Sequence, residues 1–232
     1  MLGESNTITA NLEKYNEEPT HKYTGLSTCV LKPKSTEEIS NILTYCNARK
    51  LAVVVQGGHR NLVGGAAAIF DEIVINMERM NKIHELSQYT GIIKLQAGTI
   101  IQEAQEYSNS KGYVLPIDLA TRESSQVGGA LSLNATGSSS LKYGSLRGNV
   151  VGLRVVLANG QVLDTLDAHR KDNTGYDLKQ LFIGSEGTLG IITDAAILCY
   201  SAPKAKSLCL LSMPTFEDVK AVSINVMVWL MK

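Results

Sequence analysis

Three glycine-rich loops, each at the end of a predicted helix or strand, constrain the fold of this sequence more than any other feature. They span residues 56–65, 124–140 and 183–190. Glycine allows a backbone to turn sharply and to direct several N–H groups at one point, which suits a phosphate or a diphosphate. Three such loops, spread over more than half of the chain, indicate one extended cofactor rather than three unrelated turns.

Each loop also has a simpler explanation when it is taken alone. The first follows an apolar strand but matches neither the Walker A pattern nor G-x-G-x-x-G, so a tight turn would explain it. In the second, small residues would let the backbone lie against a flat ring, or they would form a flexible linker. In the third, Gly184 alone could end a helix before the next strand.

The first half of the sequence alternates between helix and strand. Ser35 and Glu38 form a capping-box pair, and Thr99 and Gln102 repeat the pattern. Each pair predicts the start of a helix. The expected helices cover 34–49 and a segment that reaches about residue 110, and the expected strands are 51–55, read as buried, 72–75 and 91–96.

A hairpin marks a change of character in the second half. Asn159-Gly160 predicts a tight turn with positive φ at both positions. The elements expected here are strands at 151–157 and 161–163, a short helix at 176–182, a strand at 189–198 and a helix that begins at Thr215 and Asp218. The simplest arrangement is two α/β lobes joined near residues 110–120, followed by the start of a further domain.

Composition excludes several classes of protein. The 22 basic and 22 acidic side chains cancel, so a charge-driven nucleic-acid binder is not expected. The four cysteines have neither zinc-site spacing nor the density of a disulfide scaffold, and the histidines have no metal-ligand spacing. We expect no metal site and no membrane span, and we find no signal peptide or mitochondrial presequence at the N-terminus.

The segment 170–193 closely resembles the D-2-hydroxyglutarate and D-lactate dehydrogenase branch of the vanillyl-alcohol-oxidase-type flavoproteins. The resemblance extends through 31–38, 116–119 and 156–160 to Pro203. It implies an α+β fold of the p-cresol methylhydroxylase type, in which two α/β subdomains hold FAD between them. The implied domains are an N-terminal arm at 1–24, an FAD-binding domain at 25–203 divided near 110–120, and the start of a truncated substrate or cap domain at 204–232.

The resemblance also implies which residues contact the cofactor. In the first loop, at the diphosphate, these are Gln56, Gly57, Gly58, His59, Arg60, Asn61, Gly64 and Gly65. Along the cofactor they are Pro116, Asp118, Leu119, Ser124, Gly128, Gly129, Asn134, Ala135 and Gly137. The third loop would complete the pocket with Glu186, Gly187, Gly190 and Ile191.

Several positions depart from the pattern of the resembled family. The family usually carries Asn-Thr-Gly at residues 59–61, where this chain has His-Arg-Asn. It also usually carries Asn, Thr and Gly at the positions where this chain has Ala130, Leu133 and Thr136. Ser139 stands at an expected arginine and Glu123 at an expected glycine. Other branches of the superfamily link a histidine of a similar loop to the flavin, so a covalent bond at His59 is an alternative to the non-covalent binding that we favour.

The function implied is oxidation of a small D-2-hydroxy acid, with hydride transfer to FAD. D-2-hydroxyglutarate is favoured over D-lactate, electron-transfer flavoprotein is the implied acceptor, and the mitochondrion is the implied compartment. The resembled family takes its catalytic groups from a C-terminal domain, so we identify no catalytic residue here. Arg170, Lys171, Asn173 and Thr174 are either at the mouth of the pocket or ordinary surface residues. The alternatives are a degenerate, flavin-free interaction protein and, more distantly, a phosphotransferase.

Overall fold

The computed structural model describes residues 2–166, 169–205 and 207–230. The chain divides into two compact units, Met1–Ala202 and Pro203–Lys232. The first contains all three glycine-rich loops, and each unit is described by itself.

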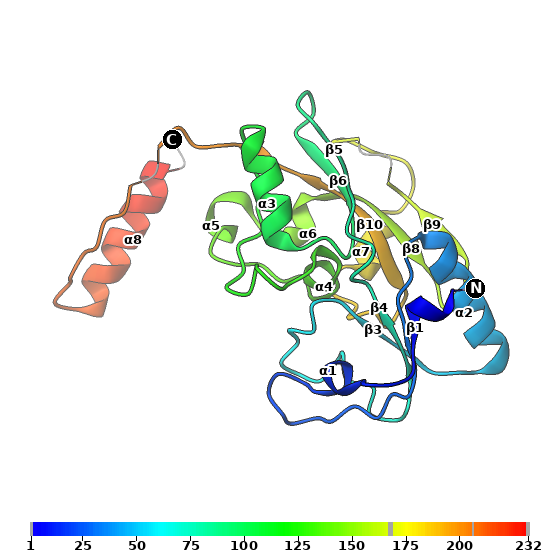
Figure 1. Cartoon of the computed structure of the whole chain (residues 1–232). Coiled ribbons are helices and arrows are strands. Elements are labelled where there is room, and N and C mark those ends of the chain that lie inside the picture. The colour runs from blue at the N-terminus through cyan, green and yellow to red at the C-terminus, as the bar shows by residue number, and fades with distance from the viewer. Residues whose placement is uncertain (1, 167–168, 206, 231–232) are drawn as a thin grey trace. The chain divides into compact units, whose positions relative to one another are not determined.

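The first unit contains short helices and three sheets (Figure 1). Its helices are the 3-10 helix η1 (Glu4–Asn6), α1 (Glu13–Asn16), α2 (Thr36–Arg49), α3 (Ile101–Ser110), α4 (Val127–Leu133), α5 (Ser140–Tyr143), α6 (Leu146–Asn149) and α7 (Lys179–Phe182). Its strands are β1 (Thr7–Ile8), β2 (Val30–Leu31), β3 (Val53–Gln56), β4 (Ile73–Asn76), β5 (Ile83–Ser87), β6 (Ile92–Gln96), β7 (Tyr113–Val114), β8 (Val150–Val156), β9 (Val162–Asp164), β10 (Ile191–Leu198) and β11 (Tyr200–Ser201).

The four-stranded sheet has the order β1-β2-β4-β3, with β2, β4 and β3 parallel to one another. Helix α2 connects β2 to β3, and the first glycine-rich loop connects β3 to β4. Val53, Val54 and Val55 are only half-buried, so the prediction of a buried strand at 51–55 was wrong. The reason is that β3 lies at the edge of its sheet, where one side lacks a neighbouring strand.

The five-stranded sheet is antiparallel, with the order β5-β6-β10-β8-β9. Strand β10 lies at its centre between β6 and β8 (Figure 1). A two-stranded sheet pairs β11 with β7. The chain passes from the four-stranded sheet to the five-stranded sheet between Asn76 and Ile83. This point comes earlier than the subdomain division expected near 110–120, and that division stays a prediction.

Two local predictions need correction, although the elements that they mark are present. Helix α3 starts after Ile100, without a side-chain cap, because the hydroxyl of Thr99 is buried and makes no hydrogen bond with the described residues. In the β8–β9 hairpin, Gly160 has φ +86° but Asn159 is not left-handed. Leu157 closes a longer loop there by donating its N–H to the carbonyl of Gln161 at 2.8 Å.

The cap of α2 is confirmed. Ser35 Oγ accepts a hydrogen bond from the N–H of Glu38 at 3.2 Å. The Glu38 carboxylate accepts from the N–H of Lys34 at 2.7 Å, one residue earlier than a capping box requires. These bonds satisfy the N–H of Glu38 in the first turn of the helix and the N–H of Lys34 just before it.

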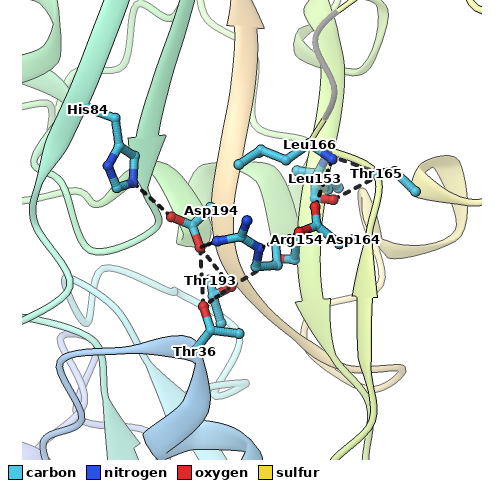
Figure 2. A network of polar contacts seen from close by, with 9 residues as sticks. All are labelled: Thr36, His84, Leu153, Arg154, Asp164, Thr165, Leu166, Thr193 and Asp194. Carbon is cyan, nitrogen blue, oxygen red and sulfur yellow. Dashed lines mark hydrogen bonds and ion pairs between the residues drawn. The ribbon is translucent and has the colours of Figure 1, made fainter.

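A buried carboxylate joins α2 to the five-stranded sheet. Asp194 of β10 accepts from His84 at 3.0 Å, from Thr193 Oγ1 at 3.0 Å and from Thr36 Oγ1 at 3.3 Å, and Arg154 lies 3.5 Å away. Figure 2 shows the side chains of His84 from β5, Arg154 from β8 and Thr36 from α2 converging on Asp194. The pairing of β10 with β8 shifts between Ile192 and Asp194, which is the signature of a β-bulge.

The second unit contains helix α8 (Phe216–Leu230). Thr215 Oγ1 accepts from the N–H of Asp218 at 3.3 Å, which confirms the predicted helix start. Phe216, Ile224 and Val226 are exposed. Among the described residues, the structure contains no helix with the length and apolar character needed to cross a membrane.

Candidate cofactor site

The three glycine-rich loops meet around one cavity of about 320 Å³. Residues near the ends of β4 and β6 also line it. The predicted contact residues that line the cavity are Gly57, Gly58, His59, Arg60, Asn61, Gly65, Leu119, Gly128, Gly129, Ala135, Glu186, Gly187, Gly190 and Ile191. Segments distant in the sequence therefore come together as the sequence predicted.

The first and second loops touch through their backbones. A Cβ atom added to Gly58 would lie 1.9 Å from the carbonyl oxygen of Ser124, a separation that only glycine permits. Two residues later, Arg60 Nε donates a hydrogen bond to Ser124 Oγ at 2.7 Å. Backbone and side-chain contacts thus hold these loops at a fixed separation.

The third loop rests on both of the others. Glu186 donates its N–H to the carbonyl of Ser132 at 2.9 Å, and Gly184 donates to the carbonyl of Leu131 at 3.1 Å. The side chains of Asn61 and Glu186 both lie beside Gly65, 3.0 Å and 3.4 Å from where its Cβ would stand. The three loops therefore form a closed ring of pairwise contacts.

Seven predicted contact residues lie outside the cavity lining: Gln56, Gly64, Pro116, Asp118, Ser124, Asn134 and Gly137. Several of them shape the loops instead. Gln56 Nε2 donates to the carbonyls of Tyr15 and Ala66, each at 2.7 Å, and so ties the first loop to helix α1. A Cβ on Gly137 would lie 1.4 Å from the carbonyl oxygen of Asp118, so the second loop passes very close to that backbone.

Gly64 and Asn134 contact residues outside the cavity lining and so hold the loops in place. Gly64 has φ +77°, and a Cβ there would lie 2.7 Å from the ring of Tyr23. Asn134 Oδ1 accepts a hydrogen bond from the N–H of Arg147 at 3.1 Å. Ser139, which stands at an arginine of the resembled family, donates its hydroxyl to the carbonyl of Pro116 at 3.3 Å. These contacts fix the path of the chain around the cavity.

Each loop contains one residue other than glycine in the left-handed region. His59 has φ +53°, Asn134 has φ +48° and Glu186 has φ +53°. Such conformations cost free energy for residues with a Cβ atom and concentrate at functional sites. Among the described residues, Asn11, His21, Lys50 and Asp71 also have positive φ, so the three loops share this conformation but it is not confined to them.

His59 is the residue of the first loop whose pKa the fold shifts. Both of its ring nitrogens are buried, without a hydrogen-bond partner among the described residues. Burial lowers the pKa of His59, while the Glu17 carbonyl and the Glu18 carboxylate act in the opposite direction. The neutral imidazole is therefore favoured near neutral pH.

The lining also contains residues that the sequence did not single out as contacts: Val55, Ala66, Met77, Ala97, Ala120, Thr121, Ser125, Gln126, Ala130, Ser132, Leu133 and Ile192. Ala130 and Leu133 are two of the positions that depart from the pattern of the resembled family. Met77 and Ala97 follow strands β4 and β6 and have no motif of their own. Only the strand pairing brings them to the cavity.

Arg170, Lys171, Asn173 and Thr174 are exposed and do not line this cavity. The first three line a separate, more polar hollow of about 360 Å³. These four residues therefore lie on the surface, away from the described lining of the cavity. No group of three potential metal ligands occurs within the described ranges.

The cavity fits a flavin dinucleotide in two respects. A Cβ on Gly129 or Gly187 would meet nothing within 4 Å, so these backbones face open space where a planar ring could lie. Gln126 Oε1 is buried in the cavity wall without a partner in the described part of the chain. A buried acceptor of this kind calls for a donor, and a cofactor could supply one.

Comparison with known families defines the class of protein. A family model described as "FAD binding domain" matches residues 27–166. Because the match covers more than half of the chain, the chain belongs to this family of FAD-binding domains. The cofactor inferred from the three loops is therefore confirmed at the level of the family.

Relatives similar to this chain are named D-2-hydroxyglutarate and D-lactate dehydrogenases. A mitochondrial D-2-hydroxyglutarate dehydrogenase of Arabidopsis thaliana is 48% identical over 209 residues, which are 89% of this chain and 37% of that protein. A Schizosaccharomyces pombe protein with the provisional name of mitochondrial D-lactate dehydrogenase is 45% identical over 216 residues, 93% of this chain and 41% of that protein. The resemblance drawn from residues 170–193 is confirmed, and the chain spans about two fifths of the length of these relatives.

A solved structure supports the fold class. Alkyldihydroxyacetonephosphate synthase superposes with a TM-score of 0.78 at 24% identity, covering 88% of this chain and 39% of that one. At this identity the likeness concerns the fold alone. The predicted α+β fold of the p-cresol methylhydroxylase type is confirmed.

Proposed function

We propose that this chain is the FAD-binding portion of an oxidoreductase that oxidises a small D-2-hydroxy acid to the 2-oxo acid. The convergence of three separate loops on one cavity is the observation that carries the proposal. Bound FAD would supply the acceptor for the hydride that leaves the substrate. The 204–232 segment is proposed to begin the substrate or cap domain.

The three loops would have different tasks in binding. Main-chain N–H groups of 57–61 and 64–65 would hold the diphosphate, as backbone N–H groups commonly do for anions. The small residues of 128–137 would lie along the cofactor, and 186–191 would complete the pocket. Binding is proposed to be non-covalent, because both ring nitrogens of His59 are buried and a flavin bond requires one to be accessible.

The substrate and the acceptor are proposed by analogy with the relatives. D-2-hydroxyglutarate is the first choice and D-lactate the second, since both acids occur in the names of the relatives. Electron-transfer flavoprotein is the proposed acceptor. A mitochondrial location is proposed because these relatives are named mitochondrial. No residue of this chain is assigned as the catalytic base.

The visible absorption spectrum of the chain, purified after expression with excess FAD, tests the proposal. A bound flavin spectrum and a micromolar or tighter dissociation constant are expected. Acid precipitation should then release all colour into the supernatant, and colour that stays in the pellet would establish a covalent bond. A colourless protein that does not change the fluorescence of added FAD would refute the proposal and favour a flavin-free interaction protein.

A second measurement addresses the reaction. Flavin bound to this chain should not be reduced by D-2-hydroxyglutarate or D-lactate under anaerobic conditions, because we assign no base or carboxylate-binding cations to the described cavity. Reduction by either acid would show that the catalytic groups are present in this chain. The spectrum and the reduction assay therefore separate cofactor binding from catalysis.

A further inference from the structure

The charges around the cavity present a problem for a diphosphate ligand. In the described part of the chain, the lining residues with a fixed charge are Arg60 and Glu186. A dinucleotide diphosphate brings two negative charges, which the Glu186 carboxylate would repel. The first loop offers main-chain N–H groups, but these carry only partial charge. A cation near the first loop would therefore have a large effect on binding.

Arg60 has the position and the free donors to supply that cation. Its side chain is exposed and lines the cavity. Nε donates to Ser124 Oγ at 2.7 Å, which uses one of the five N–H donors of a guanidinium. Within the described ranges, its two terminal nitrogens make no hydrogen bond or ion pair. Four donors of a planar cation thus remain available beside the first loop.

Ser124 determines where the guanidinium can lie. Its hydroxyl donates to the carbonyl of Thr121 at 3.4 Å while it accepts from Arg60. Its carbonyl lies against Gly58, in the loop that carries Arg60. Because the partner belongs to the second loop, the bond holds the long arginine side chain across the contact between the loops. This restraint reduces the rotamer entropy that binding would otherwise have to remove.

We propose that Arg60, positioned by Ser124, binds the diphosphate of the dinucleotide through its terminal guanidinium nitrogens. The inference rests on the proposed FAD binding and goes beyond it, because the resembled family carries an uncharged threonine at this position. A guanidinium matches phosphate oxygens with paired N–H donors. Binding by this chain would therefore use a charged side chain at a position where the resembled family usually has an uncharged one.

Affinity for FAD, measured with purified Arg60→Gln at several salt concentrations, tests the inference. Arg60→Gln should weaken binding about tenfold in 50 mM NaCl, a typical loss for one charge-assisted contact. Arg60→Lys should recover part of that loss, since it keeps the charge without the planar fork. The affinity of the wild-type chain should fall as salt rises, and that of Arg60→Gln should fall less steeply, because salt screens exposed charges.

Two controls separate the proposed role from a general effect of charge or folding. Arg49→Gln removes an exposed arginine that ends α2 and stacks on Tyr45, and it should bind FAD as the wild-type chain does. Ser124→Ala should weaken binding two- to fivefold. Combined with Arg60→Gln it should add nothing further, because the two residues act as one unit.

The outcomes decide between the possibilities. If the wild-type chain binds FAD, and Arg60→Gln binds it with equal affinity and an equal salt dependence, the role of Arg60 is refuted while the proposed function stands. An equal loss in Arg49→Gln would likewise refute it. If the wild-type chain binds neither FAD nor ADP, both proposals fall together.

Discussion

The contact between the first two loops makes Gly58 the most informative single position to change. Alanine at this residue would place a Cβ atom 1.9 Å from the carbonyl oxygen of Ser124. The φ angle of Gly58 lies outside the left-handed region, so alanine is compatible with the local backbone. Any effect of Gly58→Ala therefore reports the contact between the loops and not the strain of a turn.

The magnitude follows from the distance. Carbon and oxygen atoms in folded proteins rarely approach within 3.0 Å, so one loop must move by about 1 Å. Forced displacement of packed groups costs about 1–3 kcal/mol. For a chain of this length, that corresponds to a fall in Tm of about 2–12 °C. The displaced N–H groups would also lose their common direction, so affinity for FAD should fall as well.

Gly129→Ala provides a matched substitution with the opposite effect on stability. A Cβ on Gly129 would meet nothing within 4 Å, and the residue lies within α4. Alanine is favoured over glycine in a helix by about 0.5–1 kcal/mol. Without cofactor, Tm should therefore rise by about 1–4 °C. Affinity for FAD should still decrease, because the new methyl group would occupy the open space of the cavity.

Thermal unfolding, monitored by circular dichroism with and without FAD, measures the changes in stability and in FAD binding on the same samples. Gly58→Ala should be less stable than the wild-type chain in both conditions. Gly129→Ala should be more stable without FAD and should gain less from adding it. A Gly58→Ala protein that unfolds at the wild-type temperature and binds FAD normally would disprove the close approach of the two loops.

Three further predictions concern the rest of the first unit. Asp194→Asn should lower the free energy of unfolding by about 1–3 kcal/mol in urea titrations, since it weakens buried charge-assisted hydrogen bonds. Asp164→Asn, which changes an exposed ion pair, should lower it by less than about 1 kcal/mol. Equal losses in the two variants would contradict this prediction. Burial lowers the pKa of His59, so its contribution to stability is complete above about pH 6.5 and decreases as pH falls towards its folded pKa; His59→Asn should remove that part of the pH dependence, and identical profiles would contradict it. Burial raises the pKa of Cys199 to about 11, so a disulfide reagent at about pH 8 should modify exposed Cys209 within seconds and Cys199 only after denaturation; rapid modification of Cys199 in the Cys209→Ser protein would contradict its burial.

The sequence predicted best where a local signal and the final environment agree. The helix start at Ser35, the β8–β9 hairpin and the start of α8 follow from residues within a few positions of one another. The convergence of the loops was predicted from a different argument, namely that one extended ligand requires several glycine-rich ends. It succeeded because the requirement belongs to the ligand and does not depend on the order of the strands.

The failures arose where a distant contact decides the result. Nothing near Val53 indicates that its strand lies at a sheet edge, because that depends on pairing with β4. Thr99 has the type of a capping residue, but its hydroxyl is buried below the start of α3. Strand β5 was not predicted, since its exposed polar residues His84 and Glu85 hide the alternation. Met77 and Ala97 reach the cavity only through strand pairing, which no short motif records.

The closed ring of loop contacts has an evolutionary consequence. Because every loop rests on the two others, a substitution in one changes what the remaining two can accept, and their effects on fitness should not be independent. Gly58 limits what residue 124 can be, and Gly65 limits residue 186. The carbonyl of Ser132 accepts the N–H of residue 186 and so fixes its position as well. Drift in this region should therefore proceed by linked changes across the three segments, and a single loop transplanted from a relative should perform worse than all three moved together.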